Sequence, residues 1–156
     1  MCSSVAELHR RDTLACFEQP ERIEAVLARL EQTALLSKLR TLSSYSATDA
    51  DLQLVHGVEY VEKIKMIGHT TAEGYAARDV INAQSDLFAN TESIQAARDA
   101  AGATITVTEM VLKSEGVNRG ISIVRPPGHH AETEGPNGFC FFNNVAIAAK
   151  IAIERY

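Results

Sequence analysis

Residues 120–144 read GISIVRPPGHHAETEGPNGFCFFNN, and they carry the strongest structural signal in the chain. Residues 120–124 are a short, β-branched, apolar run bounded by Arg119 and by the pair Pro126 and Pro127. Such a pattern is typical of a buried parallel strand. We therefore expect a strand at residues 120–124, with a loop leaving its carboxyl end.

Helical patterns lie upstream of this predicted strand. Apolar residues recur at helical spacing after Pro20 and predict an amphipathic helix over residues 20–37. Thr48 and Asp51 form a capping-box pattern, which predicts a helix that reaches His56. Gly57 then separates it from a further helical stretch at residues 58–67.

The rest of the chain completes a layered architecture. Weak periodicity at residues 69–89 predicts a long surface loop, whereas residues 90–114 and 144–156 read as helices. Helices around a strand predict an α/β domain with a parallel sheet, and one visible strand is too few to complete it. We expect a poorly patterned leader at residues 1–19 and a single domain at residues 20–156.

Composition narrows the class of protein. The 156 residues suffice for one domain, and the net charge of -5 argues against direct nucleic-acid binding. The sequence holds no run of about 18 apolar residues, so no membrane association is expected. Cys2, Cys16 and Cys140 form no Cys-x-x-Cys pair, which favours a reduced, intracellular setting.

The loop after residue 124 concentrates residues that do chemistry. Ligands collect at the carboxyl ends of parallel strands, which is where this loop begins. Pro126 and Pro127 stiffen the backbone, and Gly128 permits a positive φ before the adjacent imidazoles of His129 and His130. Each feature alone has a plain structural explanation, such as an aromatic core around a buried cysteine. Their combination favours an active site.

Three chemistries fit such a loop. His130 and Glu132 mimic the His-x-Glu of zinc deaminases, but the Pro-Cys-x-x-Cys that these enzymes require is absent from the sequence. A cysteine hydrolase would need a lowered pKa at Cys140, and this alternative stays open. The third is metal-assisted amide hydrolysis, with the histidines as general base and acid.

RPPGHHAE at residues 125–132, followed by GFCFFNN at residues 138–144, resembles the signature of class II histone deacetylases. Three upstream stretches resemble helices of the same family: PERI at residues 20–23, LVHGVEYVEKIK at residues 54–65 and NTESIQAARDAAG at residues 90–102. The resemblance covers residues 19–156. It implies the three-layer, parallel-sheet arginase/deacetylase fold, of which this chain would hold the amino-terminal part.

The resemblance also implies roles for individual residues. His130 would be the general base, and His129 would stabilise charge near a metal-bound water. Phe139 would form a wall of the lysine tunnel, with the backbone of Gly138 along it.

Two further residues each have a structural alternative to a role at the site. Asp86 would bind the substrate's backbone amides at the rim, or be a solvated loop carboxylate. Arg125 would support the pocket floor, or form a structural ion pair.

The implied reaction is zinc-dependent hydrolysis of acetyl-lysine amides in proteins such as histones or tubulin. The family's zinc ligands and catalytic tyrosine are expected beyond Tyr156, so we expect the chain as written to be inactive, exposed at one apolar face and prone to aggregate. An isoform, a fragment and an incomplete gene model all fit. Alternatives are a non-catalytic interaction fragment and an acetylpolyamine amidohydrolase-like enzyme. Expected partners are an acetylated protein or peptide and corepressor or cytoskeletal proteins, in the cytoplasm, the nucleus or both.

Overall fold

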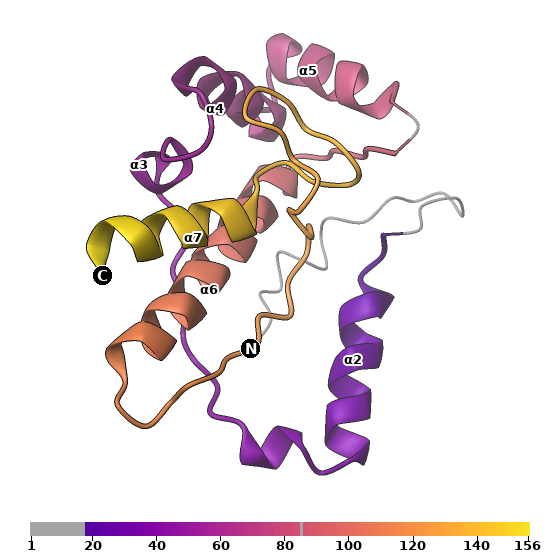
Figure 1. Cartoon of the computed structure of the whole chain (residues 1–156). Helices are drawn as coiled ribbons and strands as arrows, with labels where there is room; N and C mark the ends of the chain where they lie inside the picture. Colours follow the sequence, from indigo (N-terminus) through magenta and orange to yellow (C-terminus); the bar gives the residue numbers. More distant parts are fainter. Residues whose placement is uncertain (1–17, 85) are drawn as a thin grey trace.

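The computed structural model describes residues 18–84 and 86–156, and every regular element in those ranges is a helix (Figure 1). The predicted leader at residues 1–19 falls almost wholly outside them. In chain order the elements are α2 (Glu21–Gln32), η1 (Leu36–Lys38), α3 (Asp49–Leu52), α4 (Val58–Lys65), η2 (Met66–Gly68), α5 (Ala72–Asn82), α6 (Ser93–Lys113) and α7 (Asn144–Arg155). No helix among the described residues is both long enough and apolar enough to cross a membrane.

The strand expected at residues 120–124 is absent from the described structure. Strands are stabilised by ladder hydrogen bonds to a neighbouring strand, and no such neighbour exists in the described ranges. Instead, a guanidinium nitrogen of Arg22 donates to the Val124 carbonyl oxygen at 2.6 Å. The β pairing that is present is an isolated bridge between Asn137 and Cys140. The described part of the chain therefore does not show the parallel sheet.

The capping box at Thr48 is confirmed. The Asp51 backbone N–H donates to Thr48 Oγ1 at 3.2 Å, and the Thr48 backbone N–H donates to Asp51 Oδ2 at 3.0 Å. The helix that it starts, α3, ends at Leu52 rather than at His56. Gly57 precedes α4, and helical structure then continues through η2 to Gly68, close to the predicted limits.

Two helix predictions need correction. The helix predicted over residues 20–37 ends as α2 at Gln32, because Ala34 adopts a left-handed φ of 54° that breaks the helical path. Residues 69–89 are not a long loop, since they contain α5 with Thr71 as its N-cap. The buried face of α5 includes Arg78, whose guanidinium donates to the His69 carbonyl oxygen at 2.8 Å. A polar residue on the buried face explains the weak apolar periodicity.

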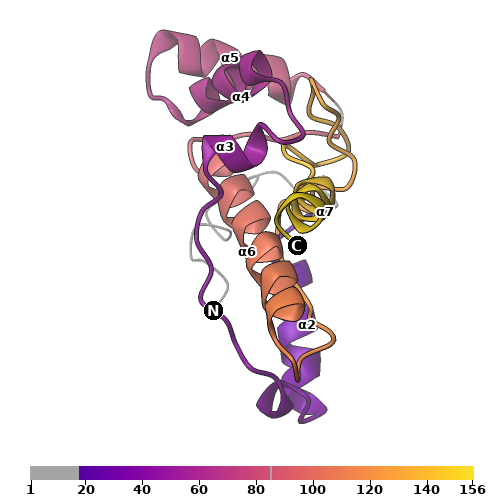
Figure 2. The ribbon, with the colours of Figure 1, turned by 60° about the vertical axis from the view of Figure 1, so that its left-hand side comes forward.

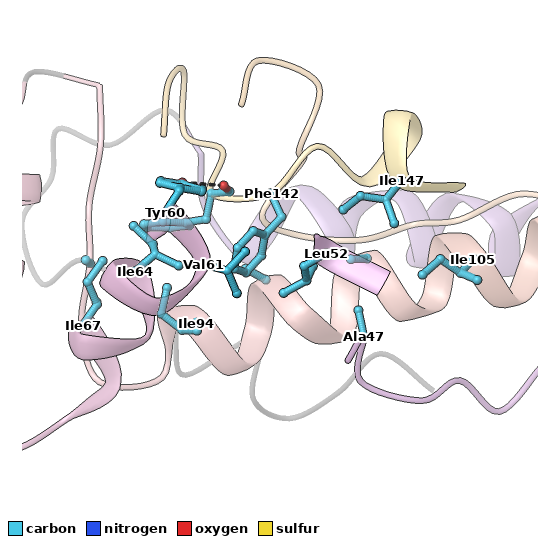
Figure 3. Packing of buried hydrophobic residues seen from close by; sticks show 14 of the residues in the cluster. Ala47, Leu52, Tyr60, Val61, Ile64, Ile67, Ile94, Ile105, Phe142 and Ile147 are labelled. Carbon is cyan, nitrogen blue, oxygen red and sulfur yellow. Dashed lines mark hydrogen bonds between the residues drawn. The ribbon is translucent and has the colours of Figure 1, made fainter. Parts of the chain in front are cut away.

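The core forms where α4, α6 and α7 meet. Helices α6 and α7 lie side by side, as two views show (Figures 1 and 2). Leu52, Val61 and Phe142 gather next to α6 in the close view (Figure 3). Each such side chain contributes about 1.5–3 kcal/mol when it is fully buried.

Helix α7 buries one face only. Ile147 and Ile151 are fully buried, whereas Val145 is 60% exposed and Ile153 is 80% exposed. Helix α7 is therefore covered on the side facing α6 and open on the other side. At its amino-terminal end, α7 anchors the loop of residues 125–143.

Candidate active site

Two consecutive asparagines hold the histidine loop on both sides of its imidazoles. Asn144 Nδ2 donates to the carbonyl oxygens of Pro126 and Pro127, at 3.3 and 3.1 Å. Asn143 Nδ2 donates to the carbonyl oxygen of Ala131, directly after His130, at 3.1 Å. The two amides therefore satisfy backbone acceptors that have no regular secondary structure to pair with.

Asn143 also fixes the start of α7. Its side-chain oxygen accepts from the Ala146 backbone N–H at 3.0 Å, which makes Asn143 the N-cap of the helix. The sequence reasoning assigned no role to either asparagine. The available signal was the position of Asn143, a preferred N-cap residue, at the start of an apolar helical pattern.

The thiol of Cys140 links Gly128 and Gly138, two of the three glycines of the loop. Cys140 Sγ accepts from the Gly128 backbone N–H at 3.0 Å and donates to the Gly138 carbonyl oxygen at 3.1 Å. Cys140 is 0% exposed, and burial raises the pKa of its thiol. A nucleophilic cysteine needs the opposite, a lowered pKa and access to substrate. The structure therefore argues against the cysteine-hydrolase alternative.

His129 and His130 are exposed neighbours whose rings meet edge to face, with centroids 4.3 Å apart. The His130 ring lies against the backbone of Gly138, which has a φ of 51°. A methyl group added to Gly138 would come within 2.7 Å of His130 Cδ2. Glycine is therefore needed at residue 138 both for its backbone conformation and for the space that the imidazole occupies.

Phe139 follows in an unusual conformation. Its φ of 66° lies in the left-handed region, which bulky side chains rarely adopt. The Phe139 backbone N–H donates to the Asp86 carbonyl oxygen at 3.0 Å, which holds the residue in place. Strained residues of this kind concentrate at functional sites, so the observation supports a role for this turn.

Asp86 braces the same turn with its side chain. The Gly138 backbone N–H donates to Asp86 Oδ2 at 3.1 Å. Asp86 is thus not simply a solvated carboxylate. The structure brings four of the predicted site residues together, because Asp86 holds Gly138 and Phe139, and Gly138 contacts His130. Binding of substrate amides by Asp86 stays a prediction.

Arg125 forms a buried ion pair at the start of the loop. Its guanidinium lies 2.7 Å from a carboxylate oxygen of Glu18, and the two side chains are 2% and 7% exposed. The structural ion pair, one of the two interpretations of Arg125, is therefore observed.

His56 is a buried histidine at the base of the loop that the sequence reasoning did not single out. Its Nε2 accepts from the Asn143 backbone N–H at 2.9 Å, and its Nδ1 lies 3.3 Å from the Thr133 carbonyl oxygen. Tyr60 packs beside it and donates its hydroxyl to the Phe141 carbonyl oxygen at 2.7 Å. His56 and Tyr60 belong to the stretch LVHGVEYVEKIK, so the sequence signal was present as a motif without an assigned role.

Within residues 18–84 and 86–156, no three His, Cys, Asp or Glu side chains cluster so that they could hold a metal ion. The described residues therefore do not fit a zinc site by themselves. What the loop offers chemically is a pair of accessible imidazoles, groups that can accept and donate protons, beside an aromatic side chain.

Comparison with known proteins gives a consistent picture. The family model described as the histone deacetylase domain matches residues 16–156. The human polyamine deacetylase HDAC10 is 39% identical over 140 residues, and histone deacetylase 5 of Arabidopsis thaliana is 37% identical over 138 residues. Among solved structures, the HDA15 HD domain superimposes with a TM-score of 0.81 at 29% sequence identity.

These matches cover nearly all of this chain and a small part of its relatives. They span 89% of this chain but 20% of the human protein, and 88% of this chain but 21% of the Arabidopsis protein. The structural match covers 96% of this chain and 41% of the HDA15 HD domain chain. The chain therefore corresponds to about a fifth of the length of the curated relatives.

Proposed function

The chain belongs to the histone deacetylase family, and we propose that it supplies the proton-transfer histidines and part of the substrate tunnel of a zinc-dependent protein lysine deacetylase. The observation that carries the proposal is the pair His129 and His130, exposed on a loop whose backbone is braced from both sides. A general base must be accessible to its proton and held in position; His130 is exposed, and the backbone on both sides of it is braced.

In the proposed reaction, His130 takes a proton from the water that attacks the amide carbonyl and returns it to the leaving amine. His129, whose ring meets that of His130, donates a hydrogen bond to the negative charge that develops beside them. Both steps use groups of this chain. Members of this family generally depend on zinc, and the proposal requires zinc ligands from residues other than those described here.

The proposed substrate is an acetyl-lysine amide in a protein. Phe139 offers an apolar wall for a methylene stem, and the backbone of Gly138 would lie along that stem. Asp86, braced against the same turn, would bind backbone amides of the peptide at the rim. A neutral amide at the end of a long apolar stem suits this combination.

We further propose that residues 120–124 join a parallel sheet in the complete domain. The run is β-branched and apolar, and Ile121 is 59% exposed in the described structure. The TM-score of 0.81 against the HDA15 HD domain supports placement of this chain within that larger fold.

Acetate release from an acetyl-lysine peptide by the zinc-loaded protein at its natural length tests the activity. His130→Ala should lower kcat by about 10²–10⁴-fold, the usual contribution of a general base, while zinc stays bound. Unchanged kcat would remove His130 from the mechanism. The 156 residues expressed alone should release no acetate; turnover with about one bound zinc per chain would contradict the proposed need for other ligands.

A second candidate is a deacetylase of small amides. The human, rat and mouse relatives that match at 38–39% identity are named polyamine deacetylases, which favours this possibility. The two candidates predict opposite ratios of kcat/KM for an acetylpolyamine and an acetyl-lysine peptide. A ratio more than tenfold in favour of the acetylpolyamine, a gap of about 1.4 kcal/mol, would replace the protein substrate with the small amide.

The partners and the location follow as proposals from the same family membership. We propose that corepressor or cytoskeletal proteins bind the complete domain, in the cytoplasm, the nucleus or both, and that any contact with chromatin is indirect given the net charge of -5. Cell fractionation and crosslinking of the natural-length protein test this. Salt-sensitive binding of naked DNA would contradict the indirect contact.

A further inference from the structure

The two ring nitrogens of His56 have different partners, and this fixes where the proton of the ring lies. Nε2 faces the Asn143 backbone N–H at 2.9 Å, so Nε2 must accept and cannot carry a proton. Nδ1 therefore carries it and donates to the Thr133 carbonyl oxygen at 3.3 Å. The ring is 2% exposed, so solvent does not compete for either nitrogen.

Both partners of His56 belong to the arm of the loop that follows His130. The Thr133 carbonyl oxygen also accepts from the Gly57 backbone N–H at 3.3 Å. Asn143 reaches back to the carbonyl oxygen of Ala131, the residue after His130, at 3.1 Å. His56 thus connects two points of this arm to each other and to the start of α4.

We propose that His56 is a positioning residue, which places the His130 imidazole by donating to Thr133 and accepting from Asn143 at the same time. The inference rests on the proposed function, because it concerns the geometry of that same site. Among side chains of suitable size, the neutral imidazole and the carboxamides can donate and accept together. An imidazolium ion cannot, because both of its nitrogens donate.

The surroundings of His56 favour the neutral ring. Burial lowers the pKa of His56, against opposing effects of the Thr133 and Glu132 backbone and the charge of Glu134. Tyr60 on α4 is the other titratable group beside the ring, and α7 presents the uncharged Phe142 and Asn143. When His56 takes up a proton in acid, the hydrogen bond from Asn143 is lost, and the arm after His130 loses one of its ties.

The first test is made on the natural-length protein with nitrogen-15-labelled histidine. Long-range proton–nitrogen correlation spectra should show His56 with its proton on Nδ1 at pH 7.5. On acidification, the ring signals of His130 should show two inflections, its own titration and a second one at the pH where His56 titrates. A proton on Nε2 of His56, or a single inflection at His130 while His56 titrates separately, would overturn the proposal.

Variants separate positioning from general stability. His56→Gln retains a donor and an acceptor without titrating, so kcat at pH 7.5 should stay within about threefold of the wild type, and the second His130 inflection should vanish. His56→Phe keeps a ring but neither hydrogen bond, and kcat should fall by about 10²-fold with KM little changed, as expected when a catalytic group is displaced. Ile105→Ala, which shortens a fully buried side chain of α6, serves as the matched destabilised control, and His69→Gln controls for loss of an exposed histidine.

The outcomes distinguish this inference from the proposed function. A His130 titration that is the same in the wild type, His56→Gln and His56→Phe would overturn the role of His56 even if the protein deacetylates peptides. Conversely, the coupled inflection in a protein that hydrolyses no amide would uphold the positioning role and overturn the proposed reaction. If neither variant folds, the tautomer of His56 and the two inflections in the His130 ring signals of the wild type still test the positioning role.

Discussion

The loop at residues 125–144 and the segment just before it are neighbours in the chain but are stabilised in different ways. The loop has almost no regular structure, yet side chains satisfy its backbone: Asn144 bonds upstream of the histidines, Asn143 and Asp86 bond downstream, and Cys140 bonds on both sides. The segment at residues 117–124 has the more regular sequence and fewer such ties, with Val117 and Ile121 exposed. Side chains can satisfy the backbone hydrogen-bonding groups of an irregular loop, whereas the backbone of a strand needs a neighbouring strand.

The largest expected effect comes from the ion pair where the two regions join. Arg125→Met removes the buried cation beside the Glu18 carboxylate and leaves Arg22, whose side chain is 42% exposed, as its partner, so the free energy of unfolding should fall by up to about 3–5 kcal/mol. Lys150→Met removes an exposed pair with Glu154 and should cost less than about 1 kcal/mol. Denaturant unfolding of both variants measures the difference, and similar losses would show that the junction is not anchored by this pair.

A substitution at Asn144 tests whether side-chain hydrogen bonds stabilise the loop. Asn144→Leu leaves the Pro126 and Pro127 carbonyl oxygens without their donor, at an expected cost of about 2–3 kcal/mol. Asn118→Leu, the same change at an exposed asparagine of the preceding segment, should change stability by less than about 0.5 kcal/mol. Equal costs in thermal or denaturant unfolding would contradict the contrast between loop and segment.

Two glycine substitutions test whether the contact between Gly138 and the His130 ring stabilises the loop. Gly138→Ala introduces a methyl group against the His130 ring in a left-handed backbone, which should cost about 1–3 kcal/mol and shift the His130 ring signals. Gly135→Ala lies in the same loop with open space around it, and its stability should stay within about 1 kcal/mol of the wild type. An unmoved His130 signal in Gly138→Ala would show that the ring does not depend on this contact.

Acidification should weaken the loop in a defined direction. The pKa of His56 is lowered from its ordinary value of 6.5, so below that pH the unfolded chain binds a proton that the folded chain resists. The stability contributed by His56 is therefore full above pH 6.5 and is lost as the pH falls through the lowered pKa. Unfolding measured from pH 7.5 to 5 should show this loss in the wild type and a smaller one in His56→Gln.

The smallest effect is expected in the segment, and it depends on context. Ile121→Thr should change the stability of the 156-residue chain by less than about 0.5 kcal/mol, because Ile121 is 59% exposed. In the natural-length protein, where residues 120–124 are proposed to join a sheet, the same substitution should cost about 1–3 kcal/mol. Equal costs in both settings would mean that the segment finds no partner strand.

Local signals in the sequence were enough for most helices. The capping box of Thr48 and Asp51 and the long helix α6 were predicted because their determinants lie within a few residues of one another. Helix α5 was missed because Arg78 occupies its buried face and bonds to backbone carbonyls, which disguises the apolar pattern.

The sequence predicted which residues of the loop lie close together, but not which residues support them. The motif places His130, Gly138 and Phe139 close along the chain, and the structure brings Asp86 to the same turn. The link between His56 and Asn143 joins residues 87 positions apart, and no local pattern specifies such a pair. The strand predicted at residues 120–124 is not formed in the described structure, because a strand needs a neighbour that a single apolar run does not define.

The buried thiol of Cys140 makes the opening rate of the loop measurable by alkylation. The sulfur is bonded to backbone groups of Gly128 and Gly138 and has no exposed surface, so an alkylating reagent reaches it only when those bonds part. The rate at which a peptide containing Cys140 becomes alkylated therefore counts the openings of the segment that bears the two histidines. The sulfur that links the backbone on both sides of the two histidines therefore also reports the opening of that backbone.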